Sequence, residues 1–272
     1  MTSPDGKYQF TLSDSGGQLH YSLTWNGKQT VKPSLLGINA NVEWRDGVEI
    51  GTVDSSRKDT IWHPVYGERS EIKDCYNAWK ILVNRQNGRD KLILDIRAYD
   101  EGIAFRYHFP GGQYLKITDE YTEYTMPEGT KAYFTPKAQT PYSYLPLENW
   151  PGESDRSLLL TLAGGGYVCL AEAQVVDYVR TKFNVSSTKK NTIISAMYGP
   201  VEDIAPYSTP WRVIMCADKP GEILEHNDIL LNLNPPCRIK DTSWIKPGKV
   251  MREVTLTTEG GKALVDLSLI HI

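Results

Sequence analysis

Pairs of acidic residues are the groups in this chain whose types and spacing come nearest to acid–base chemistry. Two carboxyl groups held at a fixed separation can act as general acid and general base, or as acid and nucleophile. The candidate pairs are Glu68 and Glu71, Glu120 and Glu123, Glu153 and Asp155, and Glu202 and Asp203. On strands and in loops such pairs are most often solvated surface, and this is the interpretation that we adopt for all four.

The aromatic residues indicate a second kind of chemistry, the recognition of sugar rings. The chain has 16 Tyr and 7 Trp against 5 Phe, and aromatic rings with one polar edge suit sugar faces as well as half-exposed strands. Strand propensity is the simpler explanation of the bias. Trp150 lies in the loop "LENWPGE", between Pro146 and Pro151, and is the best candidate for contact with a sugar. Trp211 is expected to pack between sheets.

Composition excludes several classes of protein. With 30 basic and 33 acidic residues the formal net charge of the 272 residues is −3, and no basic stripe suggests a nucleic-acid partner. No apolar run approaches the roughly 18–20 residues that span a bilayer, and the opening "MTSPDGKYQF" lacks the apolar segment of a secretory signal. The four cysteines are widely spaced and are expected to be buried free thiols.

Short alternating runs separated by turn residues fill most of the chain. In "IAFRYHF", Ile103, Phe105, Tyr107 and Phe109 share one face, which is the period of a half-buried strand. The turns "SGGQ" and "NGK" predict antiparallel hairpins. We therefore predict an all-β fold, a large antiparallel sandwich forming one domain over residues 1–241. A short helix is predicted within residues 220–233, where one face could be shared by Ile223, Leu224, Asn227, Leu230 and Leu231.

The character of the chain changes after Pro235-Pro236, because two prolines fit neither a helix nor a central strand. Residues 242–266 predict a linker, one strand and the start of a helix, with Thr257 or Thr258 as its N-cap. A strand followed by a helix is how a βα unit begins. The last six residues, 267–272 ("LSLIHI"), depart from this pattern and resemble a translated sequencing adapter, so we predict a non-native tail there.

Four phrases in order resemble the N-terminal portion of glycoside hydrolase family 97, a family of α-glucosidases and α-galactosidases. They are "YDEGIAFRY" (99–107), "LAEAQVVDY" (170–178), "STPWRV" (208–213) and "SWIKPGK" (243–249). The resemblance implies a galactose-mutarotase-like β-supersandwich followed by a (β/α)8 barrel, of which residues 242–266 would be the first βα unit. It also implies an exo-acting α-glycosidase with an oligosaccharide substrate, in the periplasm or at the outer membrane of a Gram-negative bacterium.

The resemblance also implies how the chemistry is divided between domains. Catalytic carboxylates would sit at the ends of barrel strands, so we name no catalytic residue in this chain and expect it to be inactive alone. Trp244 would seal the sandwich against the barrel.

The resemblance assigns one metal ligand to this chain. The family's N-terminal domain lends a glutamate to a calcium ion shared with the barrel, and Glu172 matches that position. Asp177, in the same phrase, is a weaker candidate for contacting substrate. The alternative for Glu172 is an ion pair with an arginine, such as Arg180 or Arg212, because a lone carboxylate among apolar residues is costly.

Two other functions compete with a family 97 domain. The first is a self-standing carbohydrate-binding or scaffold module without enzymatic activity. The second is a mutarotase-like epimerase, which would need a paired histidine and glutamate, and the five histidines stand in no recognisable motif. The predicted βα unit disfavours the self-standing module, since a finished module has no use for it.

Overall fold

The computed structural model describes residues 1–85, 88, 90–249 and 252–271. The chain divides into two compact units. The first comprises Met1–Trp62 and Lys73–Pro235, and the second His63–Ile72 and Pro236–Ile272. The predicted domain boundaries at residues 241 and 266 remain predictions, because the two units are defined only by contacts within this chain.

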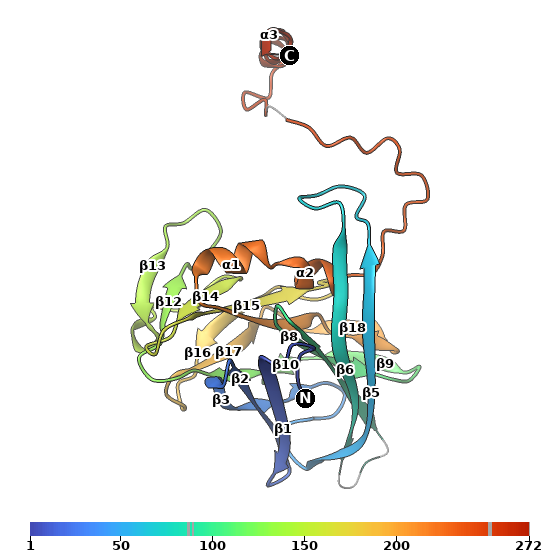
Figure 1. Ribbon diagram of the computed structural model, residues 1–272, viewed down its shortest axis with the longest axis vertical. Coiled ribbons are helices and arrows are strands. Elements are labelled where there is room, and N and C mark those ends of the chain that lie inside the picture. The colour runs from blue at the N-terminus through green and yellow to red at the C-terminus, as the bar shows by residue number, and fades with distance from the viewer. Residues whose placement is uncertain (86–87, 89, 250–251, 272) are drawn as a thin grey trace. The chain divides into compact units, whose positions relative to one another are not determined.

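A six-stranded antiparallel sheet forms one layer of the first unit (Figure 1). Its strands follow in the order β1 (Tyr8–Ser15), β2 (Gln18–Trp25), β3 (Lys28–Leu36), β11 (Glu123–Thr125), β17 (Thr192–Met197) and β16 (Thr181–Val185). The first two turns are those predicted: Gly16 and Gly17 have φ of 62° and 77°, and Asn26 and Gly27 have φ of 50° and 74°. Two consecutive positive φ values suit a tight hairpin, and glycine and asparagine tolerate them best.

A ten-stranded antiparallel sheet forms the other layer. Its order is β13 (Ser143–Pro146), β12 (Lys131–Phe134), β14 (Leu158–Thr161), β15 (Tyr167–Ala173), β20 (Trp211–Ala217), β8 (Ile103–Phe109), β7 (Lys91–Tyr99), β6 (Ile72–Arg85) and β5 (Val48–Trp62), with β19 (Tyr207–Ser208) beside β8. Two small sheets pair β4 (Ile38–Asn39) with β10 (Asp119–Glu120), and β9 (Tyr114–Ile117) with β18 (Val201–Ile204). The predicted large antiparallel sandwich is confirmed.

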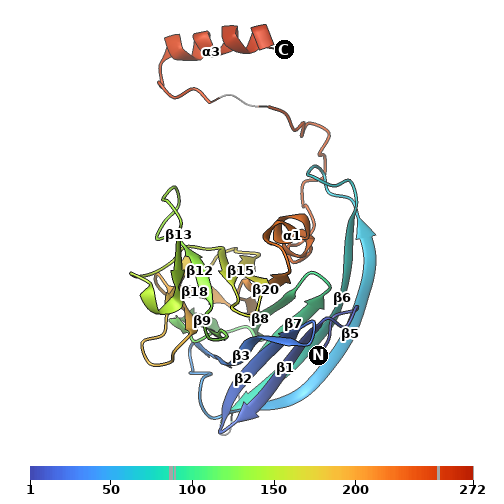
Figure 2. The same ribbon diagram turned by 60° about the vertical axis from the view of Figure 1, so that its left-hand side comes forward.

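One apolar core fills the space between the two sheets. Phe10 of β1 meets Phe105 of β8 at 6.1 Å between ring centroids, and Tyr21 of β2 meets Phe105 at 5.4 Å. Figure 2 shows β1, β2 and β3 in front of β7 and β8. The alternation predicted for β8 is confirmed, since its odd-numbered residues are buried here while Arg106 and His108 are only half-buried.

A second apolar cluster lies on the other face of the ten-stranded sheet. Two short helices, α1 (Pro220–Glu225) and α2 (Asp228–Asn232), stand where one helix was predicted. Ile229 and Leu233 pack there with Trp211, which is 1% exposed. Trp211 is thus buried as expected, but on the face away from the other sheet, because its neighbour Arg212 points into the space between the sheets.

The second unit contains helix α3 (Thr258–His271). The predicted N-cap is confirmed, because the amide of Gly260 donates to Thr257 Oγ1 at 3.0 Å. The strand predicted before it is not formed over the described residues 242–249 and 252–257; a strand needs a hydrogen-bonded neighbour. Trp244 is 67% exposed. The predicted tail lies partly outside the described residues, at Ile272 and the side chains of 268–271.

Three of the four cysteines, Cys75, Cys169 and Cys216, are buried and free, whereas the free thiol of Cys237 is exposed. In the part of the chain that the structure describes, no helix has both the length and the apolar character needed to cross a membrane.

Candidate functional site

Glu172 lies directly opposite Arg212, because β15 and β20 pair antiparallel in that register. Arg212 Nη1 donates to Glu172 Oε2 at 2.6 Å, and Thr181 Oγ1 donates to the same oxygen at 3.3 Å. The Glu172 side chain is 19% exposed while that of Arg212 is fully buried. The arginine pairing considered for Glu172 is therefore formed by Arg212. Arg180 instead pairs with Asp155, at 2.9 Å.

Glu120 is the main partner of Arg212. Arg212 Nε donates to Glu120 Oε1 at 2.8 Å, Nη2 donates to Oε2, and both side chains are fully buried. Thr122 Oγ1 also donates to Oε1, at 2.8 Å, and the Tyr178 hydroxyl to Oε2, at 3.2 Å. Such a two-pronged pair is stronger than a single charged hydrogen bond. The interpretation of the acidic pairs as solvated surface is wrong for Glu120, because Arg212 compensates its charge inside the sandwich. It is also wrong for Glu123 and Asp155, whose side chains are mostly buried and pair with Lys189 and Arg180.

A second guanidinium, that of Arg156, completes the charged cluster, defined here as Glu120, Glu172, Arg156 and Arg212. Arg156 Nε lies 3.6 Å from Glu172 Oε2, and the Arg156 side chain is 6% exposed. Its Nη2 donates to Ser195 Oγ at 3.1 Å, and its Cζ lies 3.9 Å from the centroid of the Phe183 ring. With two acids and two bases, the formal charge of the cluster is zero.

The pKa shifts in the cluster follow from burial and pairing. Burial alone would raise the pKa of Glu120, but the charge and hydrogen bonds of Arg212 hold that pKa below its ordinary value. Burial lowers the pKa of Arg212, yet Glu120 outweighs it and raises this pKa well above the usual range. The pKa of Arg156 is lowered, first by burial and then by the like charge of Arg212. At neutral pH the pair of Glu120 and Arg212 is therefore ionised.

The depressed pKa of Glu120 predicts a pH-dependent contribution to stability. A carboxyl whose pKa is lower in the folded than in the unfolded state stabilises the fold above its unfolded pKa, and this stability is lost as the pH falls through the folded value. The ordinary pKa of Glu120 is 4.5. Glu120→Gln should therefore flatten the loss of stability below that pH, measured by urea unfolding at several pH values. Glu148→Gln, at an exposed position, is the control and should leave the profile unchanged.

The loop after Glu172 carries the second predicted site residue. Gln174 and Asp177 have φ of 55° and 49°, a left-handed conformation that is uncommon outside glycine. Gln174 Oε1 accepts a hydrogen bond from Arg106 Nη1 at 3.0 Å, and the carbonyl of Asp177 accepts one from the Tyr207 hydroxyl at 2.9 Å. The Asp177 residue itself is exposed. Its role toward substrate stays a prediction.

Trp150, the third predicted residue, is half-buried and not on an open loop face. Its ring meets Phe134 edge-on at 5.4 Å between centroids, and it packs against the core between the sheets. Its Nε1 is buried and has no hydrogen-bond acceptor among the described residues. A sugar contact by Trp150 stays a prediction, and the ring face packed on the core does not contribute to it.

The residues around Glu172 fit one ligand of a shared calcium site and not a complete site. Every hydrogen bond and ion pair described for the Glu172 carboxylate goes to Oε2, and the side chain retains partial exposure. Calcium takes about 6–8 oxygen ligands, whereas the described residues include no group of three or more His, Cys, Asp or Glu side chains able to hold a metal ion. Any ion at Glu172 would need most of its oxygens from elsewhere.

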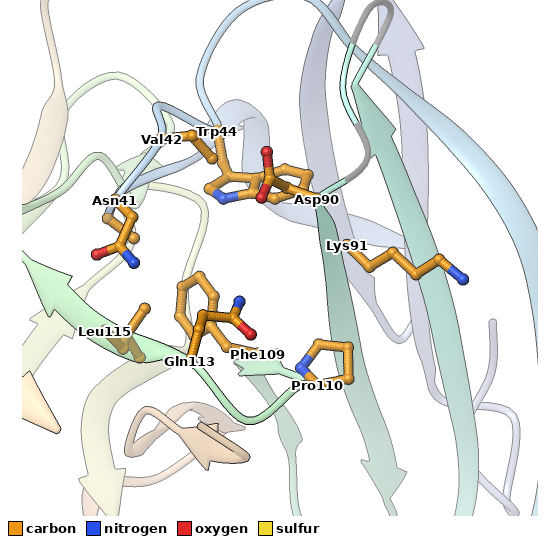
Figure 3. Close-up of a pocket in the computed structure, with 10 residues that line it drawn as sticks. Asn41, Val42, Trp44, Asp90, Lys91, Phe109, Pro110, Gln113 and Leu115 are labelled. Atoms are coloured by element: carbon orange, nitrogen blue, oxygen red, sulfur yellow. The ribbon is translucent and has the colours of Figure 1, made fainter. Parts of the chain in front are cut away.

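Two surface cavities lie away from the predicted site residues. The first, of about 320 Å³, is lined by Asn41, Trp44, Asp90, Phe109, Gln113 and others, as Figure 3 shows. Trp44 is 2% exposed, so its ring offers no stacking face there. The second, of about 490 Å³, lies beside α1 and includes Trp25, Asp100 and Glu101. Burial raises the pKa of Glu101. Glu172, Asp177 and Trp150 line neither cavity.

Glu120 and Arg156 are the members of the charged cluster that sequence reasoning missed. Each stands next to another polar residue in a short strand or loop, which resembles ordinary surface. The alternation of β15 and β20 could have indicated that Glu172 and Arg212 face the same side. Nothing local to Glu120 indicates its partner, which lies 92 positions away along the chain.

The fold and the site together define a class of protein. A large antiparallel sandwich with a buried ion-pair cluster, and with no group of metal-ligating side chains among the described residues, is a β-sandwich domain.

The family follows from a sequence match. The profile described as "Glycosyl-hydrolase 97 N-terminal" matches residues 1–236. The chain therefore belongs to glycoside hydrolase family 97, and the matched part is the family's N-terminal domain. This confirms the resemblance drawn from the four phrases.

The chain is similar to longer proteins. It is 25% identical over 296 aligned residues to a retaining alpha-galactosidase of Bacteroides thetaiotaomicron, covering 92% of this chain and 43% of that protein. A probable retaining alpha-galactosidase of Streptomyces bingchenggensis is 21% identical, with 92% and 39% covered. The chain spans less than half the length of either relative.

Solved structures share the fold. A family 97 enzyme (E480Q) from Pseudoalteromonas sp. strain K8 in complex with panose has a TM-score of 0.88 at 24% identity, with 98% of this chain and 45% of that one covered. A beta-arabinopyranosidase has a TM-score of 0.74 at 21% identity, with 80% and 40% covered. These likenesses support the predicted β-supersandwich.

Proposed function

We propose that this chain is the non-catalytic N-terminal domain of an exo-acting α-glycosidase that hydrolyses α-linked oligosaccharides. Family membership over residues 1–236 is the observation that carries the proposal. The two relatives, named retaining and probable retaining alpha-galactosidase, support α-galactosides as a substrate class, and the similar family 97 enzyme in complex with panose supports α-glucosides. The catalytic carboxylates then belong to a barrel that follows this domain, and the domain buttresses that barrel. A periplasmic or outer-membrane-associated location belongs to the same proposal.

Glu172 would contribute one ligand to a calcium ion shared with the barrel, and Asp177 would lie near the substrate. Two features support this role for Glu172. Its side chain is partly exposed, and Arg212, Thr181 and Arg156 all contact the same carboxylate oxygen, Oε2. Bound there, calcium would supply a fixed positive charge that polarises and orients a substrate oxygen. This chain's own part is to hold one carboxylate in place.

The proposal predicts that this chain alone is inactive. The measurement is hydrolysis of p-nitrophenyl α-glucoside and α-galactoside by the 272-residue chain, compared with a polypeptide in which the chain continues through the barrel. Only the longer polypeptide should release nitrophenol. Appreciable turnover by the chain alone would show that the catalytic groups lie within it.

A second prediction concerns calcium. Because one carboxylate is a small share of the about 6–8 oxygens that calcium takes, calorimetry on this chain should show no calcium binding tighter than millimolar. The longer polypeptide should bind more tightly, and Glu172→Gln should weaken that binding. Micromolar affinity in the chain alone would contradict a shared site.

A further inference from the structure

Arg156 is a buried cation that makes few hydrogen bonds. Its side chain is 6% exposed, yet its Nε and Nη1 have no hydrogen-bond partner among the described residues. Its one described hydrogen bond runs from Nη2 to Ser195 Oγ, at 3.1 Å. A buried unsatisfied donor on a charged group is costly. Hydrogen bonding therefore does not account for the placement of this guanidinium.

The charges of the neighbouring groups explain the position of the Arg156 guanidinium better than its hydrogen bonds do. Arg156 Nε lies 3.6 Å from Glu172 Oε2, the oxygen that also accepts from Arg212 Nη1 at 2.6 Å. Two guanidinium groups thus face one carboxylate oxygen, while Arg212 is also paired with Glu120. Arg156 supplies the second positive charge that balances the two glutamates, with little part in holding their geometry.

We propose that Arg156 is an electrostatic brake on cation binding at Glu172: it neutralises the cluster when no metal is bound, and it opposes a metal ion that approaches the same carboxylate. The inference rests on the proposed role of Glu172 as a cation ligand. The cluster then sets how tightly that ligand attracts a cation. Removing a positive member tightens binding, and removing a negative member weakens it.

The size of the effect follows from Coulomb's law. A unit charge and the trivalent ion used in the test below, some 6–8 Å apart at the partly wet rim and at a water-like dielectric, interact by roughly 2 kcal/mol. That corresponds to a change in affinity of roughly tenfold to thirtyfold. The two variants should shift affinity by this amount in opposite directions.

The test uses the polypeptide in which the chain continues through the barrel, because the chain alone is expected to bind cations only weakly. It is titrated with terbium(III), whose emission is sensitised by nearby tyrosine and tryptophan. Arg156→Met removes the charge and retains apolar contact with Phe183, and Arg156→Lys retains the charge. Glu120→Gln removes one negative charge without changing side-chain size. Urea unfolding of each variant verifies that it is folded. Amide shifts of β15 in NMR spectra, recorded with calcium or lanthanum(III), confirm that the ion binds beside Glu172.

The expected result is terbium binding about ten to thirty times tighter in Arg156→Met, unchanged in Arg156→Lys and about ten to thirty times weaker in Glu120→Gln. Structural damage alone would weaken binding in both neutralised variants, so opposite signs separate charge from damage. If Glu172→Gln abolishes binding but Arg156→Met does not tighten it, the brake is refuted and the proposed function stands. If Glu172→Gln leaves binding at β15 unchanged, Glu172 is not the ligand and the brake is refuted together with the proposed calcium role.

Discussion

Replacing Arg212 with methionine should lower the free energy of unfolding by about 3–5 kcal/mol, the cost of breaking a buried ion pair by removing one partner. Arg212 is fully buried and bonds Glu120 through two of its nitrogens and Glu172 through a third. Without it, the fully buried carboxylate of Glu120 loses the group that holds its pKa down. Chemical denaturation at neutral pH measures the loss.

Arg180→Met is the matched control. Arg180 also pairs with an acidic residue, Asp155, at 2.9 Å, but its side chain is 57% exposed, and exposed pairs contribute only about 0–1 kcal/mol. The double variant Arg212→Met with Glu120→Gln should recover part of the loss, since it no longer buries an unpaired carboxylate. Equal losses in Arg212→Met and Arg180→Met would show that the buried pair is not a main stabilising feature.

Trp211→Ala should cost about 3–5 kcal/mol as well, by leaving a large cavity in a well-packed cluster. The Trp211 ring is 1% exposed and contacts two guanidinium groups, with Arg97 Cζ at 4.8 Å and Arg106 Cζ at 4.3 Å from its centroid. Both cation–π contacts disappear with the ring. The loss in stability is measured by urea or thermal unfolding of the chain.

Trp244→Ala provides the contrast within the same residue type. Trp244 is 67% exposed in this chain, so its removal should change stability by less than about 0.5 kcal/mol. In a polypeptide that continues through the barrel, the same variant should be more damaging if Trp244 seals the sandwich against the barrel. A large effect of Trp244→Ala in this chain would contradict its exposed placement.

Local patterns in the sequence were sufficient to predict the main features of the fold. The alternation of Ile103, Phe105 and Tyr107 predicts which side of β8 faces the core, because successive side chains of a strand point to opposite faces. The turns at Gly16-Gly17 and Asn26-Gly27 predict the first two hairpins, because few residues accept their backbone angles. Both signals span only a few residues, so they can be read without knowing the tertiary structure.

The charged cluster could not be predicted in the same way. Glu120 next to Tyr121 and near Glu123 has the appearance of surface, and its burial depends on Arg212, 92 positions along the chain. Arg156 depends on Phe183 and on Glu172, which come from two other strands. Local patterns do not determine which distant strands become neighbours, so the pairing of Glu172 with Arg212 was one alternative among several.

The structure of residues 220–233 was predicted only in part. One amphipathic helix was predicted within residues 220–233, and the structure has two short ones, with Ile229 fully buried and Leu224 73% exposed. The break at His226-Asn227 changes which residues face inward, so the face predicted from a single helical period is wrong at Leu224.

The side chains of the adjacent residues Trp211 and Arg212 lie on opposite faces of β20. This restricts insertions and deletions within the strand. A one-residue deletion or insertion within β20 would exchange the two faces, placing a guanidinium among Ile229 and Leu233 and an indole opposite Glu120. A two-residue change would preserve the facing pattern but shift Glu172 off its partner. Gaps in alignments of this family should therefore fall in the loops that flank β20, and a gap inside the strand would indicate that both clusters have been rebuilt.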